Sequence, residues 1–221
     1  MTKAKDQRQK TSAVAAIILA AGQSSRMGAF KPLLPFGSKT VIETCIENIR
    51  DGGIEDIVVV AGMGPRADEL HRQLQNCGVI FAINPDSNSA MSASVVCGVH
   101  AVPQQAKAVV INPVDHAAVS GEVVRMLIRE WQKGARLVKP TWNKRGGHPV
   151  LVDLHFRNEL LMLDATGDLK KFFSDHGDEV RRVETESKYI ARDMDTWDDY
   201  RALHQEVFGV PAPELSVGER A

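Results

Sequence analysis

The sequence has few cysteines, and their pattern is not that of a disulfide-rich scaffold or a zinc site. Cys45, Cys77 and Cys97 are an odd number and form no Cys-x-x-Cys pair. Their neighbours are apolar or small residues, so we expect buried free thiols rather than bridges or metal ligands. The cysteine usage therefore predicts a protein of the reducing cytoplasm.

Long apolar runs and an excess of charge of one sign are also absent. No segment has the length and apolarity of a signal sequence or a membrane span. The net charge of −1 gives no overall field that would gather nucleic acid. We therefore expect neither a membrane nor a nucleic acid as a partner, and a small anion bound by local cations fits better than a duplex.

The length and composition are those of one large domain. The chain has 221 residues, of which 43% are hydrophobic, and a chain of this size can bury about two-thirds or more of its extended surface. We assign this domain to residues 13–208. Residues 1–12 are polar and predict a disordered lead, and residues 209–221 lack periodicity and predict a flexible tail.

Short apolar runs alternate with segments of helical periodicity. The runs lack polar alternation, which is typical of buried parallel strands. We expect strands over residues 14–18, 57–61, 79–83, 108–112, 137–139, 149–152, 180–183 and 189–192. Helices are expected after the capping box that begins at Thr40, over 66–75 and 92–102, after Ser120, over 155–163 and 168–176, and after Thr196, with a loop over 140–147. This order predicts an α/β fold with an open, mostly parallel, doubly wound sheet that binds its ligand at the carboxyl ends of the strands.

A glycine-rich, basic loop follows the first expected strand. It comprises Leu19-Ala20-Ala21-Gly22-Gln23-Ser24-Ser25-Arg26-Met27-Gly28, and Lys31 follows shortly after. The glycines allow backbone conformations that a Cβ would block, while the Gln and Ser residues expose amides and hydroxyls. Because Arg26 and Lys31 add two cations, an anion such as a triphosphate is the expected ligand.

Two common phosphate loops do not match this segment. A Walker loop requires Lys and then Ser or Thr directly after its second glycine, whereas Ala29 follows Gly28 here. A Gly-x-Gly-x-x-Gly dinucleotide fingerprint cannot be drawn through Gly22 and Gly28 either.

The loop resembles the signature of the molybdenum cofactor cytidylyltransferases and their relatives among the sugar-nucleotide pyrophosphorylases. The matching residues are Leu-Ala-Ala-Gly, then Arg-Met-Gly after three positions, then the lysine. The resemblance covers most of residues 14–207 and thins in the second half. It implies a Rossmann-like nucleotidyltransferase sheet and the transfer of CMP from CTP to a phosphorylated acceptor, molybdopterin first among them, with release of pyrophosphate.

The resemblance also implies which residues bind the nucleotide. Arg26 and Lys31 would hold the β and γ phosphates as catalytic cations, although either could be an ordinary surface cation. Ala21 bears on the base, since relatives with Leu-Ala-Ala-Gly tend to use CTP and those with Leu-Ala-Gly-Gly tend to use GTP; GTP or another nucleotide stays an alternative. The implied nucleotide contacts are Leu19, Ala20, Ala21, Gly22, Gln23, Ser24, Ser25, Arg26, Lys31 and Ser92.

Such a transfer requires a divalent ion, Mg²⁺, because the charge of the triphosphate must be neutralised before another anion attacks. Asp115 follows the fourth buried strand and is the candidate catalytic carboxylate and metal ligand; its alternative role is a turn after Pro113. The acidic run from Asp193 resembles the family's late Asp-x-Asp-Thr-Pro-Glu-Asp segment. We prefer Asp195 to Asp193 as the second ligand, while Thr196 and the acids after it have the pattern of a helix cap.

The chain departs from the family pattern at four positions. His116 and Ala117 follow Asp115 where a small polar or sulfur residue and Pro are usual, Trp197 replaces Pro, and Ala90 replaces Gly in the segment before Ser92, which could instead be a helix cap. The Gly-His-Pro-Val element places His148 on the acceptor side, although a His before Pro can be an ordinary loop residue.

Two rival functions remain open. Residues 62–67 satisfy Gly-x-Gly-x-x-Ala between a strand and a helix, which suggests an NAD(P)-dependent oxidoreductase, although the expected acid falls at Asp86 beyond the next strand. The second rival is a binding module that delivers a cofactor to a partner such as a molybdoenzyme or a chaperone. A pair of metal ligands, Asp115 and Asp195, argues against a binding module. If the two residues lie too far apart to share one ion, the binding module is favoured.

Overall fold

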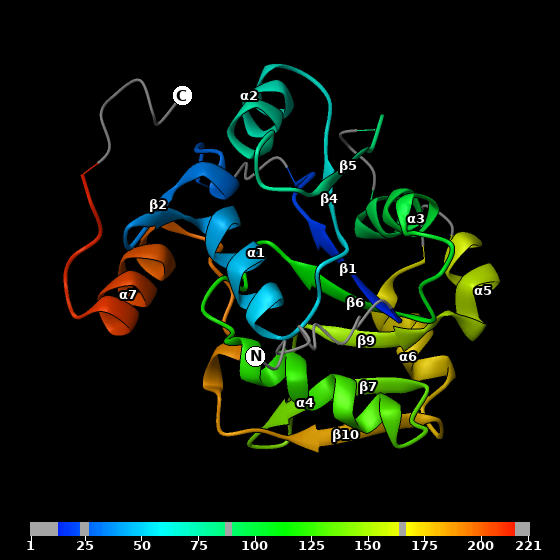
Figure 1. The fold of residues 1–221 in the computed structure, drawn as a ribbon. Coiled ribbons are helices and arrows are strands. Elements are labelled where there is room, and N and C mark those ends of the chain that lie inside the picture. Colours follow the sequence, from blue (N-terminus) through cyan, green and yellow to red (C-terminus); the bar gives the residue numbers. More distant parts are fainter. Residues whose placement is uncertain (1–12, 23–26, 87–89, 164–166, 215–221) are drawn as a thin grey trace, which may run out of the picture.

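The structure is a computed structural model that describes residues 13–22, 27–86, 90–163 and 167–214. Its main sheet has the strand order β10-β7-β9-β6-β1-β4-β5, and β8 pairs with β7 outside this path (Figure 1). The strands of this sheet are β1 (Val14–Leu19), β4 (Ile57–Ala61), β5 (Ile80–Ile83), β6 (Ala108–Pro113), β7 (Leu137–Trp142), β8 (Arg145–Gly146), β9 (Val150–Asp153) and β10 (Val180–Glu184).

Most neighbouring strands run parallel. Parallel pairs join β1 to β4 and β6, β4 to β5, and β7 to β10, whereas β9 is antiparallel to both β6 and β7. Helices connect the parallel strands, as right-handed crossovers require. The predicted α/β fold with a mostly parallel central sheet is confirmed.

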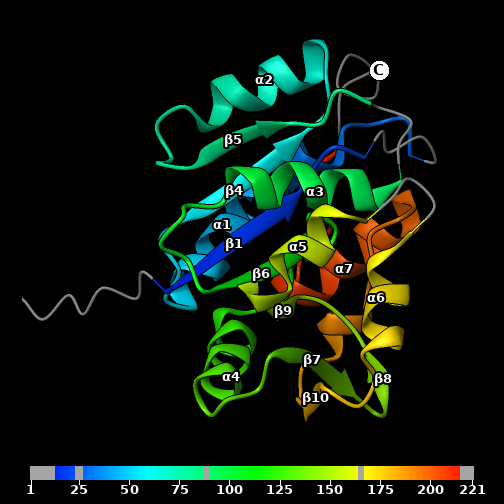
Figure 2. The same cartoon turned by 90° about the vertical axis from the view of Figure 1, so that its right-hand side faces the viewer.

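Helices cover both faces of the sheet. They are α1 (Val41–Asp51), α2 (Pro65–Leu74), α3 (Met91–Ala101), α4 (Gly121–Gln132), α5 (Arg157–Leu161), α6 (Leu169–Asp175) and α7 (Trp197–Phe208). Short 3-10 helices span Lys31–Leu33, Leu154–Phe156 and Lys188–Ala191, and a small hairpin pairs β2 (Pro35–Phe36) with β3 (Lys39–Thr40). Figure 2 shows α3, α5 and α6 along one face, opposite α1 and α4.

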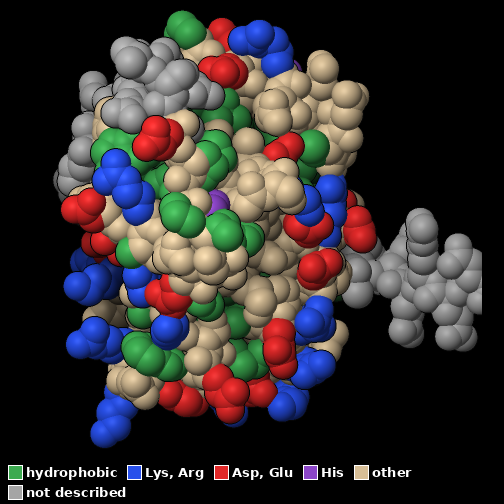
Figure 3. Space-filling view, turned by 90° about the vertical axis from the view of Figure 1, so that its left-hand side faces the viewer, with side chains coloured by type: hydrophobic (Ala, Val, Ile, Leu, Met, Phe, Trp, Pro, Cys, Tyr) green, Lys and Arg blue, Asp and Glu red, His purple; other side chains and the backbone are tan. Residues whose placement is uncertain are grey.

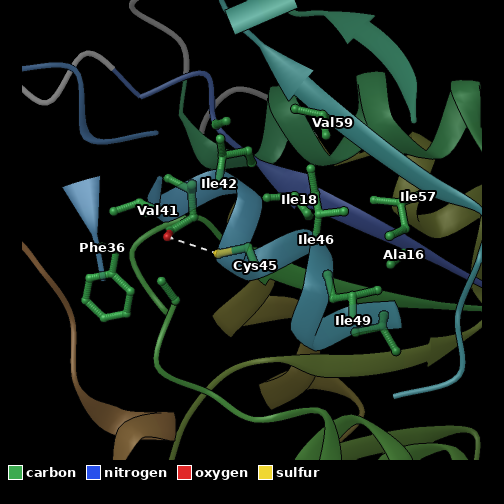
Figure 4. Close-up of a cluster of buried hydrophobic side chains, with 14 of the residues drawn as sticks. Ala16, Ile18, Phe36, Val41, Ile42, Cys45, Ile46, Ile49, Ile57 and Val59 are labelled. Carbon is green, nitrogen blue, oxygen red and sulfur yellow. Dashed lines mark hydrogen bonds between the residues drawn. The ribbon is translucent and has the colours of Figure 1, made fainter. Parts of the chain in front are cut away.

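The first strand is buried on both sides, which explains its unbroken apolar run. Ala16 and Ile18 pack into the cluster beneath α1, α2 and α4, part of which is drawn in Figure 4. Ala15 and Ile17 pack into the second cluster, beneath α3, α5 and α6. Because successive side chains of a strand point to opposite faces, a strand between two helical layers needs apolar residues at every position.

The first residues of the helices confirm the two predicted capping boxes and correct the predicted cap of α3. Thr40 with Glu43 and Thr196 with Asp199 both form reciprocal capping boxes. The proposed role of Ser92 as a helix cap is wrong, because the cap position of α3 is Ala90 and Ser92 lies in the first turn.

Two other expectations differ from the structure. The predicted strand over 189–192 is a turn of 3-10 helix, Lys188–Ala191, because the carbonyl of Ile190 accepts the backbone N–H of His148 and is not part of a ladder. The predicted loop over 140–147 is largely a hairpin: β7 continues to Trp142, and Asn143 and Lys144 turn the chain with φ of 48° and 65°. Both errors concern short segments, for which periodicity carries little information.

No helix in the described ranges is long and apolar enough to cross a membrane. The three cysteines are free: Cys45 is buried, and Cys77 and Cys97 are half-buried. The prediction of free thiols is confirmed, and that of full burial holds for Cys45 alone.

Gly147 lies against the backbone of the 3-10 helix Lys188–Ala191. A Cβ at this position would lie 1.9 Å from the backbone oxygen of Ile190, where no flexible side chain can give way. We expect Gly147→Ala to lower the free energy of unfolding by about 1–3 kcal/mol, measured by urea denaturation. Gly177→Ala is the control, since its Cβ would meet nothing closer than 3.3 Å; equal losses in both variants would contradict the predicted clash.

Candidate active site

The signature loop and Asp115 emerge from neighbouring strands at the same edge of the sheet. β1 and β6 are parallel and in register, with Leu19 opposite Pro113. The backbone N–H of Val114 donates to the carbonyl of Leu19 at 3.1 Å, so the two loops begin side by side. Leu19 and Ala20 are buried, Ala21 is half-buried and Gly22 is exposed.

Part of the predicted nucleotide site cannot be placed. Gln23, Ser24, Ser25 and Arg26 lie outside the described residues, so their expected contacts stay predictions. Ser92 is fully buried in α3, with none of its surface exposed.

Helix α1 holds the loop that carries Asp115. The Cys45 thiol donates to the carbonyl of Val114 at 3.4 Å (Figure 4), and the Asn48 side-chain amide donates to the carbonyl of Ala117 at 2.9 Å. Burial raises the pKa of the Cys45 thiol, with the Asp115 charge acting in the same direction, so the thiol keeps the proton that it donates. The backbone on both sides of Asp115 is thereby fixed to one helix.

Lys31 brings Asp115 and Asp195 together across a long sequence separation. Its Nζ lies 2.9 Å from Oδ1 of Asp195 and 4.0 Å from Oδ2 of Asp115. The lysine side chain is only 11% exposed, so these charges face one another in a poorly solvated place. The three residues that the sequence analysis singled out from distant segments thus form one cluster.

The Asp115 carboxylate is the least satisfied member of the cluster. Burial raises its pKa, His116 and Lys31 oppose the rise, and the Asp193 and Asp195 charges add to it. Its Oδ1 is buried and has no hydrogen-bond partner among the described residues. A buried carboxylate oxygen without a donor favours a further cation beside it.

These acids fit a metal that is bound partly by the substrate. Mg²⁺ in nucleotide enzymes is typically held by one or two carboxylates together with phosphate oxygens and water. Within the part of the chain that the structure describes, no group of three or more His, Cys, Asp and Glu side chains is arranged to hold a metal. Asp115 and Asp195 therefore suit a site that a triphosphate completes, and not a cage made by the protein alone.

The two late acids face different partners. Asp195 contacts Lys31, whereas Oδ1 of Asp193 lies 3.3 Å from Nε2 of His116. The same His116 nitrogen lies 3.8 Å from Oδ1 of Asp115. In the sequence, His116 stands out only as a departure from the family pattern. Its position directly after Asp115 is the sign that it belongs to the site.

His148 is joined to this cluster through His116. Their ring centroids are 5.1 Å apart, and the backbone N–H of His148 donates to the carbonyl of Ile190 at 2.8 Å. Burial lowers the pKa of His148 to about 3, with help from His116 and Lys139, so the ring is neutral. Its Nδ1 is buried and finds no partner in the described residues, which leaves it available to a bound ligand.

Trp197 docks the signature loop on α7. Its indole N–H donates to the carbonyl of Met27 at 2.8 Å, directly before Gly28. This contact was not predicted, because the sequence showed only that Trp197 stands where the family pattern has Pro. Trp197 therefore provides a hydrogen bond between the late acidic segment and the loop.

The rival glycine motif has a structural role. Gly64 occupies the cap position of α2 with φ of 98°, a conformation that favours glycine. Gly62 lies against the signature loop, where a Cβ would be 3.4 Å from the carbonyl of Ala21. The motif thus serves the turn into α2 and its packing against β1.

The face that carries α7 and β2 has mixed character. Figure 3 shows acidic, basic and hydrophobic side chains interspersed among the residues drawn in colour. No broad basic surface is visible there, which agrees with a small anionic ligand.

Comparison with known proteins gives one consistent family. The model of the MobA-like NTP transferase domain matches residues 16–180. The molybdenum cofactor cytidylyltransferase of Escherichia coli K12 is 32% identical over 192 residues, which cover 86% of this chain and 94% of that protein. Nicotine blue oxidoreductase of Paenarthrobacter nicotinovorans is 27% identical over 152 residues, covering 65% of this chain and 72% of its own length.

The fold is shared with solved structures. The crystal structure of Rv0371C from Mycobacterium tuberculosis H37Rv in complex with manganese superposes with a TM-score of 0.72 and 23% identity. The match covers 88% of this chain and 99% of that one.

The neutral state of His148 predicts a pH dependence of stability. In the unfolded chain the ring gains a proton near its ordinary pKa of 6.5, but in the folded protein only near pH 3, so the unfolded state binds more protons between these values. Stability is therefore lost as pH falls below about 6.5, by about 1.4 kcal/mol per pH unit from this residue. Between about pH 6.5 and pH 5, we expect the free energy of unfolding of His148→Gln to fall by about 2 kcal/mol less than that of the wild type. Urea denaturation at each pH measures this difference.

Exposed His155 is the matched control for the loss of an imidazole. If His148→Gln and His155→Gln change the pH dependence of stability equally, the burial of His148 is not the cause of that dependence.

Proposed function

Because the chain belongs to the family of MobA-like NTP transferase domains, we propose that this nucleotidyltransferase transfers CMP from CTP to a phosphorylated acceptor, molybdopterin in the first instance. The reaction would use Mg²⁺ and release pyrophosphate. The observation that carries the proposal is the convergence of Asp115 and Asp195 on Lys31 beside the signature loop. The 32% identical cytidylyltransferase and the Ala21 of Leu-Ala-Ala-Gly support CTP and the pterin acceptor.

The proposed metal ligands are Asp115 and Asp195. When bound there, Mg²⁺ neutralises the charge of the triphosphate and makes its α-phosphorus open to attack by an anion. Oδ1 of Asp115, which accepts no hydrogen bond from the described residues, supports this assignment, as does the solved manganese complex of the same fold. Asp193 is the weaker candidate, since its carboxylate faces His116.

Lys31 has a role in both states of the site. Without nucleotide it pairs with Asp195 and balances part of the acidic charge. With nucleotide bound, its ammonium lies beside the carboxylates, where it stabilises the charge that develops on the departing pyrophosphate, together with Arg26.

No protein nucleophile is required. A phosphate oxygen of the acceptor forms the new bond to the α-phosphorus of CTP, and the bond from that phosphorus to the bridging oxygen of the β-phosphate breaks. The electron pair of that bond leaves on pyrophosphate. The protein's contribution is to align the two phosphates and to hold the counter-charges.

His148 belongs to the acceptor side of this arrangement. Its neutral ring, whose buried Nδ1 has no partner among the described residues, supports a hydrogen bond to the acceptor rather than an ion pair with its phosphate. We place the activity in the cytoplasm on the support of the three free thiols. A molybdoenzyme or its chaperone is the proposed receiver of the product.

One observation favours a second candidate. The similarity to nicotine blue oxidoreductase keeps an NAD(P)-dependent reaction open. Against it, the glycine motif that suggested a dinucleotide is used for the entry into α2.

A ligand panel separates the two candidates. We expect CTP with Mg²⁺ to raise the melting temperature of the protein, because a ligand at 100 times its dissociation constant stabilises by roughly 2.7 kcal/mol. GTP, ATP, UTP and NADP are tested beside it, each with and without Mg²⁺, by differential scanning fluorimetry. A shift with NADP and none with a triphosphate would favour the oxidoreductase.

The acidic cluster is tested by single substitutions. Asp115→Asn and Asp195→Asn should each lower CMP transfer to molybdopterin by about 100-fold or more, because each removes a charge from the site that stabilises the transition state. The assay follows pyrophosphate release at saturating CTP. Asp198→Asn is the matched control, since this carboxylate is 96% exposed and pairs with Arg201 outside the cluster; a comparable loss in Asp198→Asn would contradict the assignment.

A further inference from the structure

His148 lines a cavity of the protein. Its volume is about 330 Å³, near the lower limit for small-molecule sites. Side chains from α3, β7, β9 and α6 and the cap residue of α6 line it together with His148: Met91, Lys139, Val150, Asp168, Leu169, Lys170 and Phe173. The volume is suited to one compact ring system and is small for a whole nucleoside triphosphate.

Two lysines and one carboxylate, that of Asp168, line the cavity, so the lysines exceed the acid by one charge. Lys139 is half-buried on β7, and its pKa is lowered by burial and by the neighbouring cations Arg182 and Lys170. Among the described residues, neither Lys139 nor Lys170 forms an ion pair with a carboxylate. The nearby carboxylate of Asp168 is engaged as the cap of α6. The half-buried Lys139 and the exposed Lys170 thus outnumber the one lining carboxylate, Asp168, which favours an anionic ligand.

The rest of the lining is apolar and includes an aromatic ring. Phe173 lies beneath the Lys139 ammonium, which is 5.8 Å from the ring centroid. Val150 and Leu169 are almost fully buried beside it. A flat heterocycle is the ligand that uses such a wall best, because it can stack on the ring while its polar edge reaches the cations.

Gly146 leaves the space that the Lys139 side chain occupies. A Cβ on this glycine would lie 2.6 Å from Cε of Lys139, which would have to move. The position of the Lys139 ammonium therefore depends on the absence of a side chain at position 146.

The cavity is connected to the carboxylate cluster by two imidazole rings. His148 lines the cavity and lies 5.1 Å from His116, whose Nε2 is 3.8 Å from Asp115. A ligand in the cavity would thus be next to the predicted metal site without overlapping it.

We propose that this cavity binds the acceptor as a planar heterocycle stacked against Phe173, with an anionic group of the same molecule held by Lys139 and Lys170. The proposal rests on the proposed function, in that it assigns the acceptor half of the same active site. It makes Lys139, Lys170 and Phe173 the residues that select the acceptor, while the signature loop selects the nucleotide.

The experiment measures binding of pterin-6-carboxylate, a fluorescent bicyclic heterocycle with one carboxylate, by fluorescence titration of the intact protein. We expect binding by the wild type and at least tenfold weaker binding by Lys139→Gln and Lys170→Gln. Gly146→Ala should also weaken binding, because it displaces the Lys139 ammonium and keeps its charge. Lys171→Gln is the matched control, since Lys171 neighbours Lys170 on α6 but pairs with Asp175.

Inorganic phosphate and glucose 1-phosphate serve as competitors without a planar ring. The proposal is overturned if the lysine variants bind pterin-6-carboxylate as tightly as the wild type does, or if glucose 1-phosphate, judged by its displacement of the probe, binds as tightly as pterin-6-carboxylate does. The melting shift with CTP and Mg²⁺ is recorded for every variant. Lysine-dependent pterin binding without a melting shift by CTP would support the cavity proposal and contradict the proposed function. A melting shift by CTP without pterin binding would support the proposed function and contradict the cavity proposal.

Discussion

The fixed position of the loop after β6 is the constraint on which the rest of the site depends. Val114 donates to β1 through Leu19, and its carbonyl accepts the Cys45 thiol of α1. The Asn48 amide holds Ala117 on the far side. The backbone around Asp115 is therefore held in place, and its side chain stays only 25% exposed although this burial raises its pKa.

The charges around Asp115 follow from that burial. One lysine, Lys31, faces both Asp115 and Asp195, so the acids outnumber the cation that holds them together. Such an arrangement is costly in an empty protein and becomes favourable when a cation and a polyanion enter together. The neutral His148 and the lysines of the adjacent cavity are likewise suited to a second anionic ligand.

Sequence patterns predicted the regular parts of the fold well, because those parts depend on local chemistry. The buried strands follow from apolar runs and the starts of α1 and α7 from capping boxes. The strand expected over 189–192 was wrong, since its backbone serves His148 across the chain. The resemblance to a family named Lys31, Asp115 and Asp195, and the structure brings them together. It did not name His116 or the cavity cations, which carry no motif of their own.

The amino-acid sequence by itself determined the layered α/β architecture and the edge of the sheet at which the signature loop lies, because periodicity, caps and glycine positions act over a few residues. Only the tertiary structure decided that Asp195 faces Lys31 while Asp193 faces His116, and that Lys139 and Lys170 line one cavity. These pairings join segments far apart in the chain. They arise from the packing of whole elements, which no local pattern encodes.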